Sequence, residues 1–213
     1  MYECLIVIPT YNPGEFIFNN LEIYKQLDPD KYKVLLIDNG TNEQYCLDIL
    51  DKLSSDFTVE KNMFGGGYEP GALLHGINKY QSKRVFLTQD SMELLDLNFI
   101  LTPDENTTKA FVIEYQPTRF LSMEQTLWIL RTFGPDVGEG LYKHYALVST
   151  TFITLRSEID KLVQQDILVE NKLPRNKKEQ ECWERVMGVA LGLNGNKFNM
   201  YHEMFKKTLM GRQ

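Results

Sequence analysis

The sequence has few cysteines and no long apolar run. Cys4, Cys46 and Cys182 are odd in number and widely spaced, a pattern that argues against a disulfide framework or a zinc site and is typical of reduced cytosolic thiols. The apolar run near the N-terminus covers only residues 5–8, which is far short of a bilayer span, and no basic segment precedes it as in a signal peptide. We therefore expect a cytoplasmic protein without a transmembrane segment.

Positive charge is also in short supply. Lysine and arginine number 23 against 29 aspartate and glutamate residues, a formal net charge of −6. This balance argues against nonspecific nucleic-acid binding over the whole surface, so no nucleic-acid partner is expected. The length of 213 residues and the hydrophobic content of 43% suit a single globular domain with a sizeable core.

The first half alternates strand and helix patterns. Strands are expected at 5–8, 33–37, 57–60 and 85–88, and helices at 16–27, 43–53 and after Pro70. Strands are expected in the second half at 109–115 and 145–155, with helices at 122–132, 157–165 and 176–191. This order predicts an α/β fold with a central, mostly parallel mixed sheet flanked by helices. Residues 134–140 are glycine-rich and acidic, and we expect a mobile loop, either over a site or as a plain surface connection.

Polar residues follow the first two strands, where ligands sit in open α/β sheets. Tyr11, after the Pro9-Thr10 exit, offers a flat face on which a base can stack; the alternative is a tight turn capped by Asn12. The Asp38 carboxylate can accept hydrogen bonds from a base or a ribose hydroxyl, and the alternative is an Asx turn.

Two further features lie beyond the third and fourth predicted strands. The segment 65–71 has the spacing G-x-G-x-x-x-G, but it follows the third strand, whereas a dinucleotide fingerprint follows the first. Its backbone N–H groups can still approach a diphosphate or a sugar, and His75 just beyond it is expected to be a packed or surface residue. Asp90 ends the fourth strand, where a carboxylate can grip a hard cation that carries phosphates.

Four blocks in this order carry a resemblance to a known family. They are residues 5–12 (Leu-Ile-Val-Ile-Pro-Thr-Tyr-Asn), 36–41 (Leu-Ile-Asp-Asn-Gly-Thr), the glycine segment, and 86–91 (Phe-Leu-Thr-Gln-Asp-Ser). Together they resemble the GT-A glycosyltransferases, especially family 2; the glycine segment and compact length also resemble a chlorella-virus-encoded glycosyltransferase domain. The resemblance implies one Rossmann-like GT-A domain over 1–213, with a nucleotide-sugar half at 1–100 and an acceptor and catalytic half at 101–213.

The resemblance also implies roles for individual residues. The nucleotide and sugar would be bound by Pro9, Thr10, Tyr11, Asp38, Gly66, Gly67, Gly71, Thr88 and Gln89. The triplet of Thr88, Gln89 and Asp90 stands where the family has D-x-D, so Asp90 would bind Mn²⁺ or Mg²⁺. Thr88 departs from the motif and removes one charge. The Gln-Asp-Ser continuation resembles the rhamnosyltransferase branch and suggests a deoxyhexose donor.

A general base and a second metal ligand are expected in the second half. The base candidates are Glu181 first, then Glu179 and Glu184, on the helix predicted at 176–191; Glu181 can pair with Arg185 four residues on. The alternative is a solvated helix face. The stripe of Cys182, Val186, Val189, Ala190 and Leu193 is expected to be buried. By resemblance, His202 would assist the metal, with His144 as competitor, and either can be structural.

The function that the resemblance implies is transfer of a hexose or deoxyhexose from a UDP-sugar or similar donor to a hydroxyl of a glycan or glycoprotein. The acceptor half is short for the family, which suggests one module of a larger polypeptide, acting in the host cytoplasm if it is virus-encoded. Two alternatives stay open: a catalytically inactive nucleotide-sugar or glycan-binding module of the same fold, and an NAD-dependent Rossmann enzyme.

Overall fold

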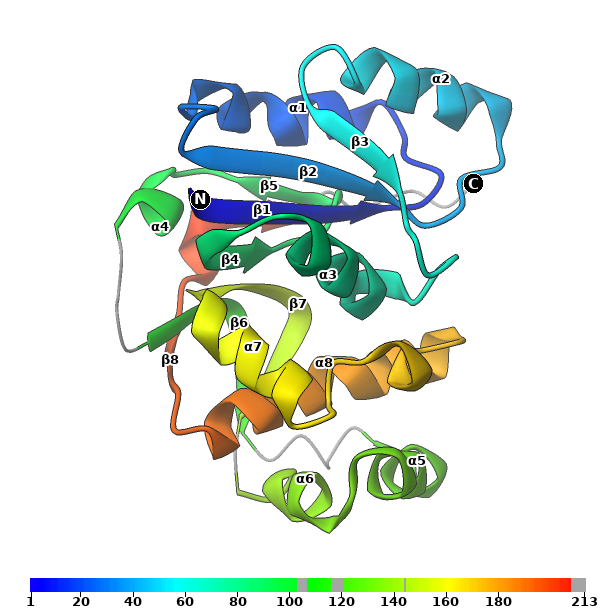
Figure 1. Ribbon diagram of the computed structural model, residues 1–213, viewed down its shortest axis with the longest axis vertical. Helices are drawn as coiled ribbons and strands as arrows, with labels where there is room; N and C mark the ends of the chain where they lie inside the picture. The colour runs from blue at the N-terminus through cyan, green and yellow to red at the C-terminus, as the bar shows by residue number, and fades with distance from the viewer. Residues whose placement is uncertain (103–106, 116–120, 144, 208–213) are drawn as a thin grey trace.

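The computed structural model describes residues 1–102, 107–115, 121–143 and 145–207, and it has an α/β architecture (Figure 1). In this part of the chain the central sheet has seven strands in the order β3-β2-β1-β4-β7-β6-β8. The strands are β1 (Tyr2–Thr10), β2 (Tyr32–Asp38), β3 (Thr58–Lys61), β4 (Ser82–Leu87), β6 (Thr107–Tyr115), β7 (Tyr145–Leu155) and β8 (Lys197–Met200). Of these described strands, β7 alone runs antiparallel to its neighbours, so the predicted mostly parallel mixed sheet is confirmed.

Helices cover both faces of the sheet, as crossovers between parallel strands require (Figure 1). One face carries α1 (Phe16–Glu22), its 3₁₀ continuation (Ile23–Gln26), α2 (Gln44–Leu53) and the short α4 (Asn98–Leu101). The other face carries α3 (Tyr68–Lys79), α7 (Arg156–Gln164) and α8 (Lys177–Leu193), and α5 (Met123–Phe133) and α6 (Pro135–Gly140) pack against α8. The helices predicted at 16–27, 43–53, 122–132, 157–165 and 176–191 are thus confirmed, with small shifts at their ends.

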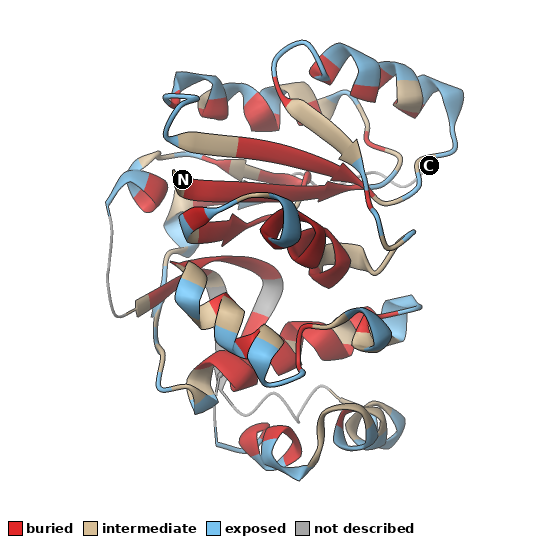
Figure 2. Ribbon diagram, viewed as in Figure 1, coloured by how far each residue is buried: buried red, intermediate tan, exposed pale blue. Residues whose placement is uncertain are grey.

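The central strands are apolar on both faces because both faces are covered. In β1, Leu5 and Val7 belong to the core on the α3 and α8 side, whereas Ile6 and Ile8 belong to the core on the α1 and α2 side. Figure 2 shows β1, β4 and much of α8 as buried. The continuous apolar run in the sequence therefore reflects a strand enclosed between two helical layers.

The prediction of a loop at residues 134–140 is wrong. The structure has α6 there, which begins with Pro135, a residue suited to the first helical turn. Val137 and Leu141 are buried, and α6 packs on α5 and α8 at the lower end of the view in Figure 1, away from the glycine segment between β3 and α3. Packing of these two apolar residues outweighs the glycine content.

A small two-stranded sheet, β5 (Met92–Leu94) with β9 (Phe205–Lys207), was not expected from the sequence. It brings the second half of the chain back beside the segment that follows β4. Phe205 packs edge to face on Phe99, with ring centroids 4.8 Å apart, which anchors the pair. No helix in the described ranges is long and apolar enough to cross a membrane.

Candidate functional site

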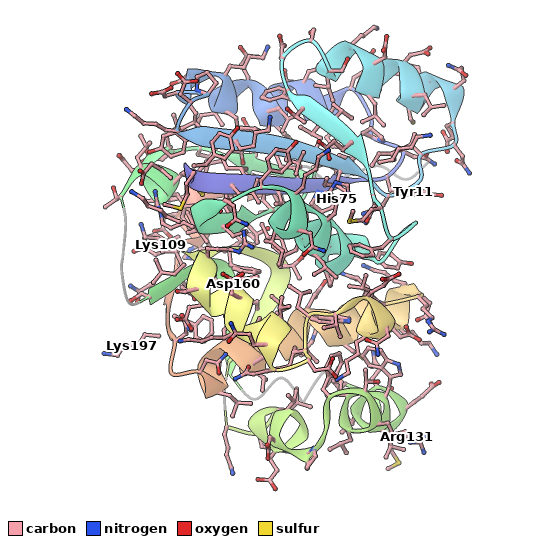
Figure 3. All side chains as sticks on the ribbon, in the orientation of Figure 1. Tyr11, His75, Lys109, Arg131, Asp160 and Lys197 are labelled. Carbon is pink, nitrogen blue, oxygen red and sulfur yellow. The ribbon has the colours of Figure 1, made fainter. Side chains whose placement is uncertain are left out.

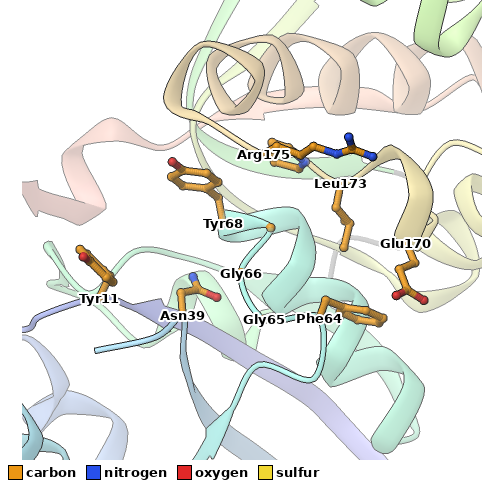
Figure 4. Close-up of a pocket in the computed structure, with 11 residues that line it drawn as sticks. Tyr11, Asn39, Phe64, Gly65, Gly66, Tyr68, Glu170, Leu173 and Arg175 are labelled. Carbon is orange, nitrogen blue, oxygen red and sulfur yellow. The ribbon is translucent and has the colours of Figure 1, made fainter. Parts of the chain in front are cut away.

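The carboxyl ends of β1 to β4 meet at one edge of the sheet, and a cleft of about 620 Å³ opens there. Figure 4 shows Tyr11 and Asn39, which follow β1 and β2, on one side of the cleft and Arg175 on the other, with the glycine segment between them. In Figure 3, Tyr11 marks this edge and Lys197 lies at the opposite one. The cleft is therefore where ligands of open α/β sheets bind.

The glycine segment forms the wall of the cleft between β3 and α3. Gly65, Gly66 and Gly67 have φ values of 65°, 146° and 83°, conformations in which a side chain would be strained. The Asn62 amide donates hydrogen bonds to the Gly66 carbonyl at 2.5 Å and to Asn39 Oδ1 at 2.7 Å. The Asn62 side chain thus fixes one side of the loop, and the three glycines on its other side line the cleft.

Gly71 has a different position from the one predicted. Gly71 lies in α3, and a Cβ atom at this position would point at the Gly66 carbonyl and the Asn62 amide. Gly71 is not among the residues that line the cleft. Its small size allows close packing of α3 on the loop. Gly71 thus packs against the loop, whereas Gly66 and Gly67 line the cleft; contact of these glycines with a sugar or a diphosphate stays a prediction.

The residues predicted to bind the nucleotide gather at the ends of β1 and β2. Tyr11 is 56% exposed and lines the cleft, whereas Pro9 and Thr10 are buried. The Thr10 hydroxyl has no hydrogen-bond partner within the described residues. Asp38 Oδ1 accepts from the backbone N–H groups of Gly40 (3.1 Å) and Thr41 (2.7 Å), so the Asx turn, the alternative weighed above, is present.

Asp90 follows β4 beside two polar neighbours. Its side chain is buried, and burial together with the charge of Glu69 raises the pKa of Asp90 to about 7. Glu69, in the first turn of α3, accepts a hydrogen bond on Oε1 from the Gln89 side chain at 2.9 Å. Glu69 Oε2 is buried and has no partner within the described residues; burial, with the charge of Glu184 adding to it, raises the pKa of Glu69.

Thr88, the departure from D-x-D, is buried at the end of β4, and its hydroxyl has no partner in the described part of the chain. Thr150 in β7 shows the same orphaned hydroxyl and has φ of 46°. The register pairs Phe152 with Leu87, which places Thr150 beside the residues that follow β4. Strained non-glycine residues cluster at functional sites, so Thr150 joins the candidate site.

Two of the three predicted bases, Glu184 and Glu181 of α8, have different partners. Glu184 is buried: its Oε1 accepts from Gln180 at 2.9 Å, and its Oε2 pairs with Arg185 at 2.8 Å. Glu181 accepts from Gln125 of α5 at 3.3 Å. The predicted pairing of Glu181 with Arg185 is wrong, because the Arg185 guanidinium pairs with the Glu184 carboxylate and reaches only the backbone carbonyl of Glu181.

Glu179, the third candidate, lies in the first turn of α8, where the N-cap Asn176 accepts on its side-chain oxygen from the Glu179 backbone N–H at 3.0 Å. The Glu179 carboxylate accepts from Asn176 Nδ2 at 2.9 Å and from the Arg175 backbone N–H at 2.8 Å, so it holds the N-cap residue and the residue before it. The predicted buried stripe of α8 is confirmed at Cys182, Val186, Val189 and Ala190, whereas Leu193 is 44% exposed. Among these acids, Glu184 is the one whose charge raises the pKa of Glu69.

His202 does not reach Asp90. The β5–β9 register pairs Met92 with Lys207 and Leu94 with Phe205, so His202 lies beyond the Leu94 end, whereas Asp90 precedes Met92. His202 is exposed and lies 3.4 Å from Glu203. His144 falls outside the described residues. Across the described ranges, no group of three or more His, Cys, Asp or Glu side chains is arranged to hold a metal ion.

Sequence reasoning missed Asn62, Glu69 and Arg175. Glu69 is the acidic residue within the glycine segment, at residues 65–71. Its position in a candidate ligand loop could have marked it as a site residue, but only the glycines of the segment were considered. Asn62 and Arg175 become site residues only through tertiary contacts, because the loop before α8 crosses to the glycine segment in the folded chain. His75, by contrast, is packed as predicted and accepts a hydrogen bond on Nδ1 from the Met63 N–H at 3.0 Å.

Comparison with solved structures identifies the fold. The mannosyltransferase PcManGT from Pyrobaculum calidifontis, solved with GDP-Man and Mn²⁺, matches 99% of this chain and 58% of its own at 13% identity and a TM-score of 0.56. S. aureus TarS 1-349 matches 98% and 60% at 14% identity and 0.57, and its UDP complex 95% and 58% at 15% identity and 0.54. No protein-family model and no curated protein sequence matches the chain.

These matches show a GT-A-like α/β fold shared with nucleotide-sugar glycosyltransferases. The chain spans no more than 60% of the length of these three matched structures. At such identities the likeness concerns the fold, and function has to be argued from the site.

Proposed function

We propose that this chain is a metal-dependent glycosyltransferase that moves a hexose or deoxyhexose from a UDP-sugar, or a similar nucleotide-sugar, to a hydroxyl of a glycan or glycoprotein. The observation that carries the proposal is the continuity of the glycine-lined cleft with the carboxylate after β4. Tyr68 lines the cleft, and the adjacent Glu69 is hydrogen-bonded to Gln89, next to Asp90. The proposed nucleotide pocket and the proposed cation-binding carboxylate would thus share one edge of a GT-A-like sheet.

The donor would lie along the cleft. Tyr11 would stack on the base, and the second oxygen of Asp38, together with Pro9 and Thr10, would contact the base or the ribose. The backbone N–H groups of Gly66 and Gly67 would approach the diphosphate, as consecutive N–H groups in left-handed conformations do. Arg175 faces the glycine segment across the cleft and would add a positive charge there.

The residues around Asp90 fit a divalent cation. Mn²⁺ and Mg²⁺ prefer carboxylate and phosphate oxygens, and the buried Asp90 carboxyl group lies near enough to Glu69 for the Glu69 charge to raise its pKa. The orphaned buried oxygen of Glu69 lies in the same surroundings. When bound, the ion would neutralise the charge that develops on the departing diphosphate.

Glu184 is the proposed base, ahead of Glu181. A base must lie near the donor sugar, whose diphosphate the cleft and Asp90 would hold. The charge of Glu184 raises the pKa of Glu69, whereas Glu181 accepts a hydrogen bond from α5 and Glu179 is hydrogen-bonded to Asn176 at the start of α8. Gln180 and Arg185 would hold the Glu184 carboxylate in one orientation for the acceptor hydroxyl.

Calorimetric titration with UDP-sugars in Mn²⁺ or in EDTA tests this proposal. We expect binding in Mn²⁺, clear weakening in EDTA, and the same weakening in Asp90→Ala. Metal-independent binding that Asp90→Ala leaves unchanged would remove the central claim.

Two alternatives give different results in simple assays. A binding module of the same fold would bind the donor without releasing UDP in the presence of acceptor or water. An NAD-dependent enzyme would be stabilised thermally by NAD(H) rather than by a UDP-sugar. The structure places the glycine segment after β3 and not after β1, so it lacks the position of a dinucleotide fingerprint.

A further inference from the structure

The segment after β4, residues 88–91, contains a single carboxylate, that of Asp90, at the ligand edge of the sheet. Thr88 stands where a second acid would be, and its buried hydroxyl carries no charge. His202 lies at the far end of the β5–β9 pair. Affinity of oxygen sites for divalent cations rises with the number of charged ligands, so a second anionic ligand has to come from another element.

Glu69 is placed to be that ligand. The left-handed Gly67 and the positive φ of Tyr68 turn the chain into α3, so Glu69 enters the helix beside the end of β4. The hydrogen bond from Gln89 Nε2 to Glu69 Oε1 ties the carboxylate to the residue before Asp90. The remaining oxygen, Oε2, is buried and has no protein donor in the described part of the chain.

The other charged groups nearby are already committed. Both carboxylate oxygens of Glu184 have partners, in Gln180 and Arg185. The Lys177 amine donates to Gln180 Oε1 at 2.6 Å, so it influences Glu69 only through space. Burying an anionic oxygen without a donor is costly, and a cation shared with Asp90 would remove that cost.

We propose that Glu69 and Asp90 together form the divalent-cation site, with Glu69 supplying from α3 the charge that Thr88 does not supply from β4. The proposal rests on the proposed function only in that the donor's diphosphate oxygens, with water, complete the coordination shell. In this proposal Glu69 is a metal ligand, and it neither contacts the sugar nor acts as the general base.

Mn²⁺ binding measured directly, by loss of the free-ion electron paramagnetic resonance signal with and without UDP, tests the assignment. The variants are Glu69→Gln and Asp90→Asn, with Glu22→Gln as the matched control, because Glu22 is an exposed acid of α1 that is not among the residues lining the cleft. We expect Mn²⁺ affinity to fall by at least about tenfold in both site variants, since losing even an outer partner of a metal costs that much. The control should bind Mn²⁺ as the unaltered protein does.

Thermal unfolding provides the second readout and guards against misfolding. Without metal, Glu69→Gln should melt no lower than the unaltered protein, because it removes a buried negative charge beside Asp90. Mn²⁺ should raise the melting temperature of the unaltered protein more than that of the variant. If Glu69→Gln fails to fold, Glu69→Asp keeps the charge on a shorter side chain and should still bind Mn²⁺ more weakly.

Two results would overturn the assignment in distinguishable ways. Full Mn²⁺ affinity in Glu69→Gln, or in Glu69→Asp where that variant is used, together with loss in Asp90→Asn, would leave the proposed function standing and reject Glu69 as a ligand. Absence of Mn²⁺ binding by the unaltered protein, even with UDP bound, would reject both the site and the metal dependence of the proposed transfer.

Discussion

The side-chain amide of Asn62 donates a 2.5 Å hydrogen bond to the backbone carbonyl of Gly66 and so fixes the middle of the glycine segment. The same amide donates to Asn39, and its Oδ1 accepts from the Phe64 N–H at 3.1 Å. Asn62 is only 8% exposed. One buried side chain thus joins the segment after β2 to the wall of the cleft.

Asn62→Ala should therefore both destabilise the protein and weaken donor binding. The substitution leaves the Gly66 carbonyl without its amide donor, a loss of about 1–3 kcal/mol in the free energy of unfolding. Urea denaturation gives the stability and calorimetry the affinity for UDP. Asn78→Ala, at an exposed position of α3, is the control and should change neither; equal behaviour of the two variants would show that Asn62 does not hold the loop.

Gly71→Ala should destabilise the protein although the site is helical. In an ordinary helix interior, alanine is favoured over glycine by about 1 kcal/mol. At this position a Cβ atom would press on the backbone carbonyl of Gly66 and on the Asn62 amide, so either α3 or the loop has to move. A lower urea midpoint and weaker UDP binding are expected. A gain in stability of the ordinary helical size would show that the loop yields without cost.

The sequence predicted most of the fold because the pattern and the packing agree. Strand β7 was predicted at its observed bounds, and α5 and α8 begin at the polar residues Ser122 and Asn176, which cap them. The prediction failed at α6, where glycines signal a loop but Val137 anchors a helix. Short strands such as β5 carry too few residues for a periodic pattern.

The candidate site was predicted less completely, for a physical reason. Asp90 and Tyr11 were visible because they follow strands, whereas the roles of Glu69 and Arg185 depend on contacts that no local pattern contains. Arg185 has acids at spacings of one and four residues, and only the fold decides that its partner is Glu184. The roles assigned to Asp90 and Tyr11 by resemblance stay predictions.

Lowering the pH should remove the contribution of ionised Glu60 to the free energy of unfolding. Glu60 lies in β3, which precedes the glycine segment. Burial opposes the charged form, but hydrogen bonds from Lys79, Tyr80 and His75 prevail and lower the pKa of Glu60 from 4.5 to about 2. The depressed pKa means that the contribution is complete above about pH 4.5 and is lost as pH falls toward about 2. The lowering of the Glu60 pKa corresponds to at most about 3 kcal/mol in the free energy of unfolding.

The comparison is between Glu60→Gln and Glu22→Gln, because Glu22 is an exposed acid that pairs with Lys25. Urea unfolding at neutral pH should show a clear loss for Glu60→Gln that shrinks as the pH is lowered through this window. Glu22→Gln should lie within about 0.5 kcal/mol of the unaltered protein throughout, as surface substitutions do. A loss for Glu60→Gln that does not vary with pH would contradict the charge-based account.

The cysteines should be unreactive in the folded protein. All three are buried, and burial raises the pKa of Cys4 and Cys182 to about 12 and also raises the pKa of Cys46. Because the thiolate is the nucleophile, a disulfide reagent at pH 8 should label the native chain slowly and all three thiols after denaturation. Rapid labelling of the native chain would show that a thiol lies at an accessible, activated position.

Substitution of the three α8 acids should separate catalysis from structure. Glu184→Gln keeps the size of the side chain and should lower kcat by about 10²–10⁴-fold, the usual share of a general base, with little change in donor affinity. Glu181→Gln should retain most activity, because its carboxylate turns toward Gln125. Glu179→Gln should act on stability rather than on kcat, since the Glu179 carboxylate accepts hydrogen bonds from the Arg175 backbone and from the N-cap Asn176. The measurements are UDP release at saturating donor and acceptor, donor titration, and urea unfolding of each variant. A large kcat loss in Glu181→Gln, with Glu184→Gln near normal, would move the base to Glu181.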